Sequence, residues 1–438
     1  MIEFDGFTPR ERHGKTQYLA DRRIVFAVAY FGYAFCYLVR NNFKLTASPF
    51  AEQLGISAVD VGIILAAFPL AYAPGKLFMG LLADRTSMRM LLPGCVAFSA
   101  LLCTVIPLVS SAAVLTVLMA LLGLVQGAGA PAALGMISAW YPNPTRGAAV
   151  VAWNTSQNLG AGVLAAFAMI ILEYFSNDWR LIFWIPALLS ALFAIWLWKN
   201  GKNRPWQEGY PTLNALYGPA GVPCTAIVQR DSYWRLLFSA LTSSPVLLLL
   251  LLLNALLYLL RFGVLNWITF YLPRTKGVSI AAAHNMFAVL EFMAIPTVVI
   301  FALLAWKWPS GMCAIGGISM LALALSLMFY AYVSDLNMVF YASTVLGGLI
   351  YAPQVIINVL TVNLMPPRMV GAAVGAVGLS GYLVGEILAN TVVPVVAQNY
   401  GWPAVYLGLA GVALLTAGVY FWLRPYEKSA VVLSGDSC

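Results

Sequence analysis

Long apolar runs alternate with short polar breaks along nearly the whole chain. The runs are bounded by Gly, Pro or charged residues, and each approaches the roughly twenty residues that a helix needs to cross the hydrocarbon core of a bilayer. The pattern predicts an all-α membrane protein with twelve transmembrane helices. Their expected ranges are 24–46, 58–83, 90–110, 113–140, 147–173, 180–198, 244–272, 279–305, 310–333, 337–363, 371–396 and 402–423.

The longest polar interruption, 199–243, divides the expected spans into two sets of six. It combines lysines, arginines and acids with several prolines and glycines, a composition typical of a linker. The sequence therefore predicts an N-terminal six-helix half (1–198), a cytoplasmic linker (199–243) and a C-terminal six-helix half (244–438).

The two halves repeat each other at a nearly constant offset. Pro74 and Pro296 are 222 positions apart, Gly123 and Gly347 are 224 apart, and the tetrapeptide 147–150 (Gly-Ala-Ala-Val) recurs at 371–374. Two halves in the same orientation, related by an axis along the membrane normal, are the plan of the major facilitator fold, in which substrate binds between them near the midplane.

Composition and charge narrow the function classes. The chain is 61% hydrophobic and 9% charged, which excludes a soluble globular protein. Its net charge of +8 does not form a single basic patch, so no nucleic-acid partner is expected. The six cysteines are scattered, and no metal-ligand spacing, nucleophile–base pair or P-loop is found. We expect no enzyme activity, no cofactor and no metal.

The distribution of lysine and arginine predicts the orientation. Seventeen of these residues fall in the expected loops of one side and four (Lys44, Arg180, Arg274 and Lys276) in those of the other. Because positive charge collects on the cytoplasmic side, both termini are expected in the cytoplasm. No cleavable signal is expected, since residues 1–23 are polar. The prediction is a monomeric multi-pass protein of the inner (plasma) membrane, with the lipid bilayer as its surroundings.

Two arginines lie deep inside apolar runs. Arg40 follows Tyr33 and Tyr37 at helical spacing, and Arg261 repeats that spacing after Tyr258. A buried arginine in a bilayer is costly unless it faces a cavity, a partner or a ligand. Two guanidinium groups on facing halves suit a dianion, because each matches phosphate or carboxylate oxygens. The alternative is that each arginine pairs with a buried acid or extends outward.

Other polar groups inside the expected spans are candidates as well. Lys76 is a pathway cation or a side chain that extends to the interface. Asn154, Gln157 and Asn158 share a helix face and could hold substrate oxygens or join helices. Glu291 and Glu386 could carry protons, pair with an arginine or receive a substrate amine. We favour the arginine-pairing role for Glu291 and leave Glu386 open.

A charged motif follows the second expected span. Residues 80–89 read Gly-Leu-Leu-Ala-Asp-Arg-Thr-Ser-Met-Arg and resemble the major facilitator loop signature G-x-x-x-D-R-x-x-x-R. An acid at a helix end that meets basic residues would form a cytoplasmic gate, which predicts gate roles for Asp84, Arg85 and Arg89. The alternative is an ordinary set of cytoplasmic loop charges.

Several segments together resemble the organophosphate:phosphate antiporters, with most similarity to their phosphoglycerate transporter branch. These segments are 37–43 (Tyr-Leu-Val-Arg-Asn-Asn-Phe), 261–272, 291–296 and 349–354. The resemblance implies that Arg40 and Arg261 bind the substrate phosphate. It further implies that Lys76 is a pore lysine and that Tyr33, Tyr37 and Tyr258 are site tyrosines.

The chain also departs from that family. Gln157 stands where the family has a histidine, and Glu386 stands where a small residue is usual. The first expectation is a transporter that exchanges a phosphate ester for inorganic phosphate by alternating access. A zwitterionic phosphate or phosphonate, or a polycarboxylate imported with protons, would fit as well. A third possibility is a membrane sensor that binds the ligand without transporting it.

Overall fold

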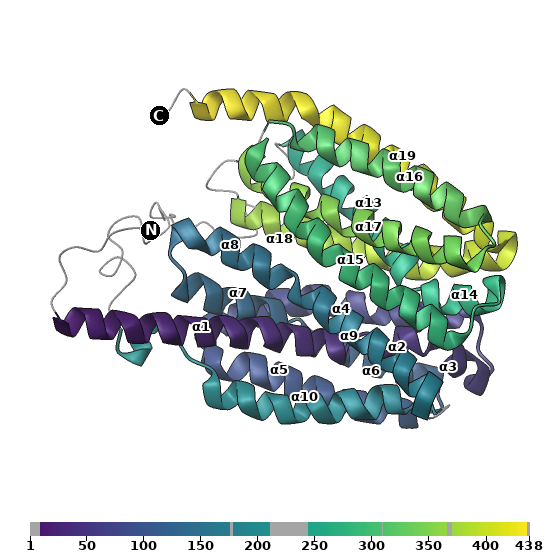
Figure 1. The fold of residues 1–438 in the computed structure, drawn as a ribbon, viewed down its shortest axis with the longest axis horizontal. Helices are drawn as coiled ribbons and strands as arrows, with labels where there is room; N and C mark the ends of the chain where they lie inside the picture. Colours follow the sequence, from purple (N-terminus) through teal and green to yellow (C-terminus); the bar gives the residue numbers. More distant parts are fainter. Residues whose placement is uncertain (1–8, 176–177, 211–243, 309, 366–369, 436–438) are drawn as a thin grey trace.

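The protein is described by a computed structural model that covers residues 9–175, 178–210, 244–308, 310–365 and 370–435. Within these residues the secondary structure is helical throughout, without a strand. Figure 1 shows two helical bundles side by side, one formed by α1–α10 and the other by α13–α19. Residues 211–243 of the predicted linker lie outside the described residues.

The first bundle is built from ten α-helices and three short 3-10 or π segments. They are α1 (Pro9–Leu38), α2 (Asn42–Leu45), α3 (Ala47–Leu54), α4 (Ala58–Arg85), α5 (Met88–Val105), η1 (Ile106–Leu108), α6 (Ala112–Gln126), α7 (Gly129–Trp140), α8 (Asn143–Asn154), α9 (Ser156–Ile170), η2 (Ile171–Phe175), α10 (Leu181–Asn200) and η3 (Pro205–Glu208).

The second bundle contains longer helices. They are α13 (Pro245–Leu265), α14 (Ile268–Lys276), α15 (Ile280–Lys307), α16 (Met312–Tyr332), α17 (Leu336–Leu364), α18 (Val370–Ser380), the π-helix η5 (Gly381–Glu386) and α19 (Ile387–Gly435). The helix α19 is interrupted at Gly401, whose φ of 81° is a conformation that glycine adopts without a steric penalty.

Local chemistry explains where several helices begin. Ser57 and Asp60 form a capping box at the start of α4, so two backbone N–H groups that lack helical partners are satisfied. Ser279 caps α15 and Asp335 caps α17 through side-chain acceptors. The spans therefore start close to the residues that the polar breaks indicate.

Ten helical stretches of the described chain are long and apolar enough to cross a membrane. The last, Ala373–Glu427, contains the break at Gly401, and α1 contains residues 24–38 of the expected first span. These elements account for the twelve predicted helices. The predicted range of the first span, 24–46, was wrong in detail. The helix ends at Leu38, and α2 and α3 follow as separate short helices.

The first residues of α1 and the last residues of α19 lie at the same end of the molecule in Figure 1. We call this the terminal end, and the opposite end, with α2, α3 and α14, the sealed end. At the sealed end the Thr269 hydroxyl donates to the carbonyl of Lys44 (2.9 Å), and His284 Nε2 bonds to the carbonyl of Leu45 (2.8 Å). The backbone of α2 is thus held by the opposite bundle.

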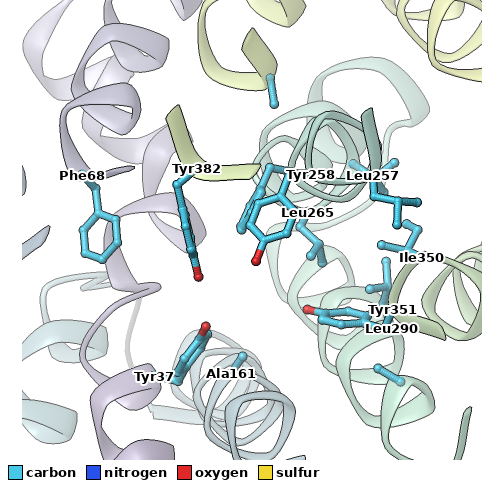
Figure 2. Packing of buried hydrophobic residues seen from close by; sticks show 14 of the residues in the cluster. Tyr37, Phe68, Ala161, Leu257, Tyr258, Leu265, Leu290, Ile350, Tyr351 and Tyr382 are labelled. Carbon is cyan, nitrogen blue, oxygen red and sulfur yellow. The ribbon is translucent and has the colours of Figure 1, made fainter. Parts of the chain in front are cut away.

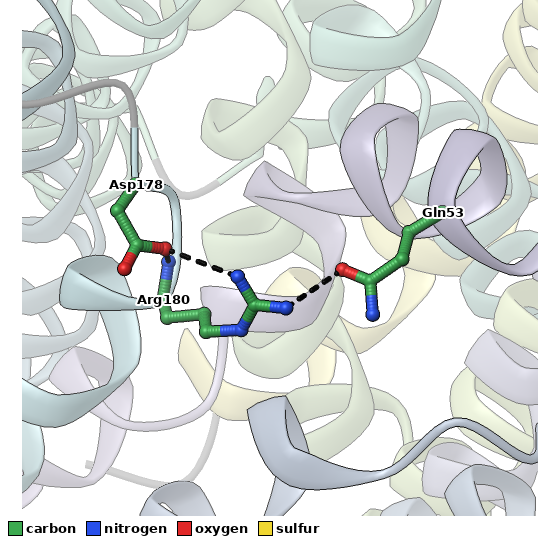
Figure 3. Close-up of polar contacts among 3 residues, drawn as sticks. All are labelled: Gln53, Asp178 and Arg180. Atoms are coloured by element: carbon green, nitrogen blue, oxygen red, sulfur yellow. Dashed lines mark hydrogen bonds and ion pairs between the residues drawn. The ribbon is translucent and has the colours of Figure 1, made fainter.

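Helix α3 connects the bundles at the sealed end. Within its own bundle, Arg180 donates to the Gln53 side chain (3.0 Å) and lies 3.5 Å from Asp178, as Figure 3 shows. Toward the other bundle, Glu52 lies 3.5 Å from Arg274. Both ion pairs are substantially exposed, so they orient α3 rather than add much stability.

Glycines allow close backbone approach between the bundles. A Cβ atom on Gly62 of α4 would overlap the carbonyl oxygen of Asn390 in α19, and one on Gly162 of α9 would lie 2.7 Å from the Phe292 ring. Glycine at these two positions therefore allows the two bundles to approach closely.

Candidate functional site

A narrow cavity lies between the two bundles. Its lining is dominated by charged, amide and aromatic side chains, with a few aliphatic ones. The residues are Tyr37, Arg40, Asn41, Lys44, Leu65, Phe68, Met119, Arg261, Phe262, Leu265, Asn266, Glu291, Tyr351 and Glu386. The lining residues come from both bundles, so the cavity lies at their interface.

Several aromatic side chains converge on this region. Figure 2 shows four hydroxyl groups pointing toward one shared space, those of Tyr37, Tyr258, Tyr351 and Tyr382. These residues come from α1, α13, α17 and η5 respectively, so both bundles contribute. Hydroxyl groups both donate and accept hydrogen bonds, which suits a site for an oxygen-rich ligand.

Arg40 follows the end of α1 and is 8% exposed. Its guanidinium lies over the rings of Phe68 (4.3 Å), Tyr72 (4.6 Å) and Tyr37 (4.9 Å). Within the described chain the guanidinium forms one hydrogen bond, from Nη1 to the Tyr37 hydroxyl at 3.3 Å. An aromatic face attracts a cation but accepts no hydrogen bond from N–H groups that lie in the plane of the guanidinium. Most of the five N–H donors of Arg40 therefore remain available to a ligand.

Arg261 occupies the corresponding place on α13 and is 7% exposed. Its guanidinium lies over Tyr351 (4.1 Å), Phe262 (5.2 Å) and Tyr258 (5.9 Å). Within the described residues it forms no hydrogen bond or ion pair, and Nε is buried without a partner. A buried donor without an acceptor costs about 1–3 kcal/mol. The Arg261 guanidinium is therefore suited to bind an anion.

Glu291 has neutral partners. One carboxylate oxygen accepts hydrogen bonds from the Tyr351 hydroxyl (2.7 Å) and from Asn158 Nδ2 (2.9 Å). No ion pair within 4.0 Å joins Glu291 to an arginine in the part of the chain that the structure describes. The predicted arginine pairing is therefore not a direct contact, and the bond from Asn158 connects α9 of one bundle to α15 of the other.

Glu386 lines the same cavity with fewer partners. It is 4% exposed, and its Oε2 is buried without a hydrogen-bond partner. It is the last residue of the π-helix η5, and single π-helical turns are frequent at functional sites. Glu386 thus joins Arg40 and Arg261 in one space, as an intramembrane acid with unused hydrogen-bonding capacity.

Lys44 also lines the cavity, which the sequence did not indicate. It was assigned to a loop on the non-cytoplasmic side, but it is 7% exposed, and its amine lies 5.1 Å from the Phe287 ring. The cause is the end of α1 at Leu38: the chain turns through Asn41 into α2, and Lys44 is directed inward. Three cations therefore share the cavity with two acids.

The remaining predicted residues divide into two sets. Gln157 lies beside the cavity and accepts a hydrogen bond from the Tyr37 hydroxyl (3.1 Å), and it lies 3.5 Å from Asn154. Tyr33 packs on Tyr37 with ring centroids 5.3 Å apart. These residues surround the lining of the cavity rather than form it.

Lys76 and Tyr258 do not line the cavity and lie near the π-helix, although the Tyr258 hydroxyl points toward the same space (Figure 2). The amine of Lys76 is 5.9 Å from the Tyr382 ring, and the Tyr258 ring is 5.0 Å from Tyr382. Tyr382 also packs against Tyr72 at 4.7 Å and thereby connects the bundles. The sequence did not single out Tyr382, because nothing in its local pattern distinguishes it from other tyrosines in apolar runs.

The predicted gate is described only in part. The side chains of Asp84 and Arg85 lie outside the described residues. Arg89 donates through Nε to the carbonyl of Trp198 (3.2 Å), which belongs to its own bundle. Its gate role therefore stays a prediction, and within the described residues no hydrogen bond or ion pair joins Arg89 to the other bundle.

Comparison with known proteins identifies the family. The model of the Major Facilitator Superfamily matches residues 29–387. The chain belongs to this superfamily. The structure of a bacterial homologue of the human lysosomal transporter Spinster, inward-facing and unoccupied, superimposes with a TM-score of 0.72 at 18% identity, covering 94% of this chain and 97% of that one. The nucleoside transporter NupG gives 0.69 at 14% identity, covering 91% and 99%. The predicted fold is confirmed.

Curated relatives in the superfamily cover most of the chain. A phosphoglycerate transporter protein of Salmonella typhimurium is 28% identical over 395 residues (87% of this chain, 85% of the relative). A glycerol-3-phosphate transporter of Bacillus subtilis is 26% identical over 406 residues (89% of each). A hexose-6-phosphate:phosphate antiporter of Escherichia coli is 26% identical over 409 residues (88% and 86%). The resemblance to organophosphate:phosphate antiporters is confirmed.

Proposed function

We propose that this superfamily member is a secondary transporter that exchanges a small phosphate ester for inorganic phosphate. The observation that carries the proposal is the pair Arg40 and Arg261. They come from opposite bundles, line one cavity, and are stabilised by aromatic rings rather than by carboxylates. The relatives named as phosphate-ester transporters support the same substrate class.

The two arginines would bind the phosphoryl group from opposite sides. Each guanidinium can donate two parallel hydrogen bonds to a tetrahedral oxyanion. The Tyr37 hydroxyl bridges Arg40 and Gln157, so Gln157, with Asn154 next to it, would position the Arg40 side of the site. Lys44 would add a third positive charge, whereas Lys76 would attract anions at the edge of the route to the cavity.

Transport would proceed by rocking of the two bundles around this site. The sealed end, closed by the hydrogen bonds to Lys44 and Leu45 and by the contact at Gly62, would face the outside. Its three remaining basic residues (Arg180, Arg274 and Lys276) are far fewer than the seventeen assigned to the other side. We therefore place the protein in the inner membrane with both termini in the cytoplasm. Because one chain supplies both arginines, a monomer is sufficient.

Reconstitution in liposomes tests this function. Vesicles loaded with inorganic phosphate should take up labelled glycerol 3-phosphate much faster than vesicles without internal phosphate. Uptake that ignores internal phosphate but follows an imposed pH gradient would instead support a proton-coupled importer of a phosphonate or polycarboxylate. Binding of phosphate without any uptake would support a membrane sensor. The observation that favours the proton-coupled alternative is the buried acid Glu386 in the cavity.

A further inference from the structure

The two acids of the cavity differ in their surroundings. Glu291 already accepts hydrogen bonds from Tyr351 and Asn158. Glu386 is as deeply buried, yet Oε2 has no partner. An unpaired polar atom at a buried position is costly in the absence of a ligand. Glu386 interacts with Asn266 but keeps Oε2 unpaired, so it is the acid of the cavity with a buried oxygen that still lacks a hydrogen bond.

The charges of the cavity are not cancelled by internal ion pairs. Arg40, Lys44 and Arg261 face Glu291 and Glu386, and among the described residues no cation of this set lies within 4.0 Å of either acid. Three positive and two negative groups leave a formal charge of +1. A dianionic phosphoryl group alone would reverse this to −1. A phosphoryl group joined to an ammonium group has a net charge of −1 and would bring the site to neutrality, which is favoured in a medium of low dielectric constant.

The backbone around Glu386 shows how its position is fixed. Gly381 and Gly385 of η5 pack against α13 so closely that added Cβ atoms would lie 2.7 Å from Asn254 and 2.5 Å from Tyr258 respectively. Ser380 donates to the carbonyl of Leu251 (3.0 Å) on the same helix. These contacts hold the π-helix on α13, the helix that carries Arg261, so the acid and the arginine belong to one rigid unit.

We propose that the substrate is zwitterionic: a small phosphate ester or phosphonate that carries a primary ammonium group. Arg40 and Arg261 hold the phosphoryl oxygens, and the Glu386 carboxylate accepts hydrogen bonds from the ammonium group. This inference rests on the proposed function and specifies the substrate of the same site. Glu291 takes no part in recognising the amine, since its hydrogen bonds come from the protein.

Two probes of nearly equal size test the proposal. We would measure displacement of labelled inorganic phosphate from the purified full-length protein by 2-aminoethyl phosphate and by 2-hydroxyethyl phosphate, which differ in the ammonium group. The amine should bind roughly tenfold tighter or better, as expected for a charge-assisted hydrogen bond in a buried site. In Glu386→Gln the two probes should bind within about twofold of each other, because the neutral amide cannot balance the ammonium charge.

Glu291→Gln is the matched control, because it neutralises the other acid of the same cavity. It should retain the preference for the amine, whatever its effect on phosphate affinity. Equal binding of the two probes by the unmodified protein overturns the inference, and this comparison needs no variant to fold. A preference that persists in Glu386→Gln overturns it as well.

The outcomes also separate this inference from the proposed function. If the protein binds inorganic phosphate and 2-hydroxyethyl phosphate but shows no preference for the amine, only the inference of a zwitterionic substrate is wrong. If it binds none of the phosphate probes, the proposed function itself fails. If binding without an amine preference strengthens at low pH, and Glu386→Gln removes that dependence, Glu386 holds a proton and the inference is overturned.

Discussion

The two sides of the cavity hold their arginines in similar surroundings but with different degrees of restraint. Arg40 lies over Phe68 and is tied through Tyr37 to Gln157. Arg261 lies over Tyr351 and has no hydrogen bond within the described chain. Both cations are stabilised by ring faces. One side is therefore anchored through a hydrogen-bonded chain, and the other is left free.

This comparison shows how a membrane protein can keep a buried cation ready for a ligand. A carboxylate partner would stabilise the arginine but would compete with an incoming phosphate for the same donors. Ring faces offset part of the cost of burial and leave the donors in place. Glu291 is consistent with this arrangement, since its carboxylate accepts hydrogen bonds from Tyr351 and Asn158 rather than from an arginine.

The largest effect is expected from replacing either arginine. Arg40→Lys and Arg261→Lys each keep the charge but lose the planar fork, so phosphate affinity should fall about 100-fold in each. Isothermal titration of the purified variants with inorganic phosphate measures this loss. Retention of full affinity by Arg261→Lys would show that only the anchored side of the cavity binds phosphate.

The next effect concerns the contact that brings the two sides together. Gly62→Ala places a Cβ atom against the Asn390 carbonyl, and such overpacking costs roughly 1–3 kcal/mol. The sealed end should open more often, so labelling of a cysteine introduced there should increase about tenfold. Gly80→Ala on the same helix is the control, since an added Cβ meets nothing within 4 Å. Equal labelling in both variants would argue that Gly62 does not hold this end closed.

A smaller effect should distinguish the anchored arginine from the free one. Tyr37→Phe removes the hydroxyl that joins Arg40 to Gln157 and should weaken phosphate binding roughly fivefold, in line with about 1 kcal/mol for one hydrogen bond. Tyr330→Phe serves as the control, because its hydroxyl accepts a hydrogen bond from Ser343 and lies away from the cavity. Unchanged phosphate affinity in Tyr37→Phe would show that the hydrogen bonds through Tyr37 do not anchor Arg40.

The smallest effect is expected at the link between α14 and α2. Thr269→Val removes the hydrogen bond to the carbonyl of Lys44 and should increase opening of the sealed end by about threefold to fivefold. The control is Thr297→Val, since the Thr297 hydroxyl bonds within its own helix, to Met293. The labelling assay used for Gly62 measures both. An increase of the same size in the control would assign the effect to general destabilisation.

Much of the fold and part of the site could be predicted from the sequence. Arg40 and Arg261 stand out because a charge within an apolar run has few explanations, and the repeat placed them on facing halves. Lys44 was misplaced, because its position depends on where α1 ends. The chain leaves the helix after Leu38 and forms α2, and no proline or glycine in the sequence marks that break.

The partners of the arginines could not be predicted for a different reason. Tyr351 and Phe68 reach the guanidinium groups through packing between distant helices, whereas local periodicity reports only which face of a helix is apolar. The π-helix that presents Tyr382 and Glu386 has no sequence signature either. Glu386 was recognisable as an intramembrane acid, but its position beside both arginines required the three-dimensional structure.

The central claim is that Arg40 and Arg261 together form the phosphate site of an exchanger. Exchange of labelled inorganic phosphate across liposomes that contain the protein tests it most directly. We predict that unlabelled phosphate inside the vesicles accelerates uptake of the label, and that Arg40→Lys and Arg261→Lys each abolish this acceleration. Uptake that is independent of internal phosphate, or exchange that persists when both arginines are replaced, would contradict the account.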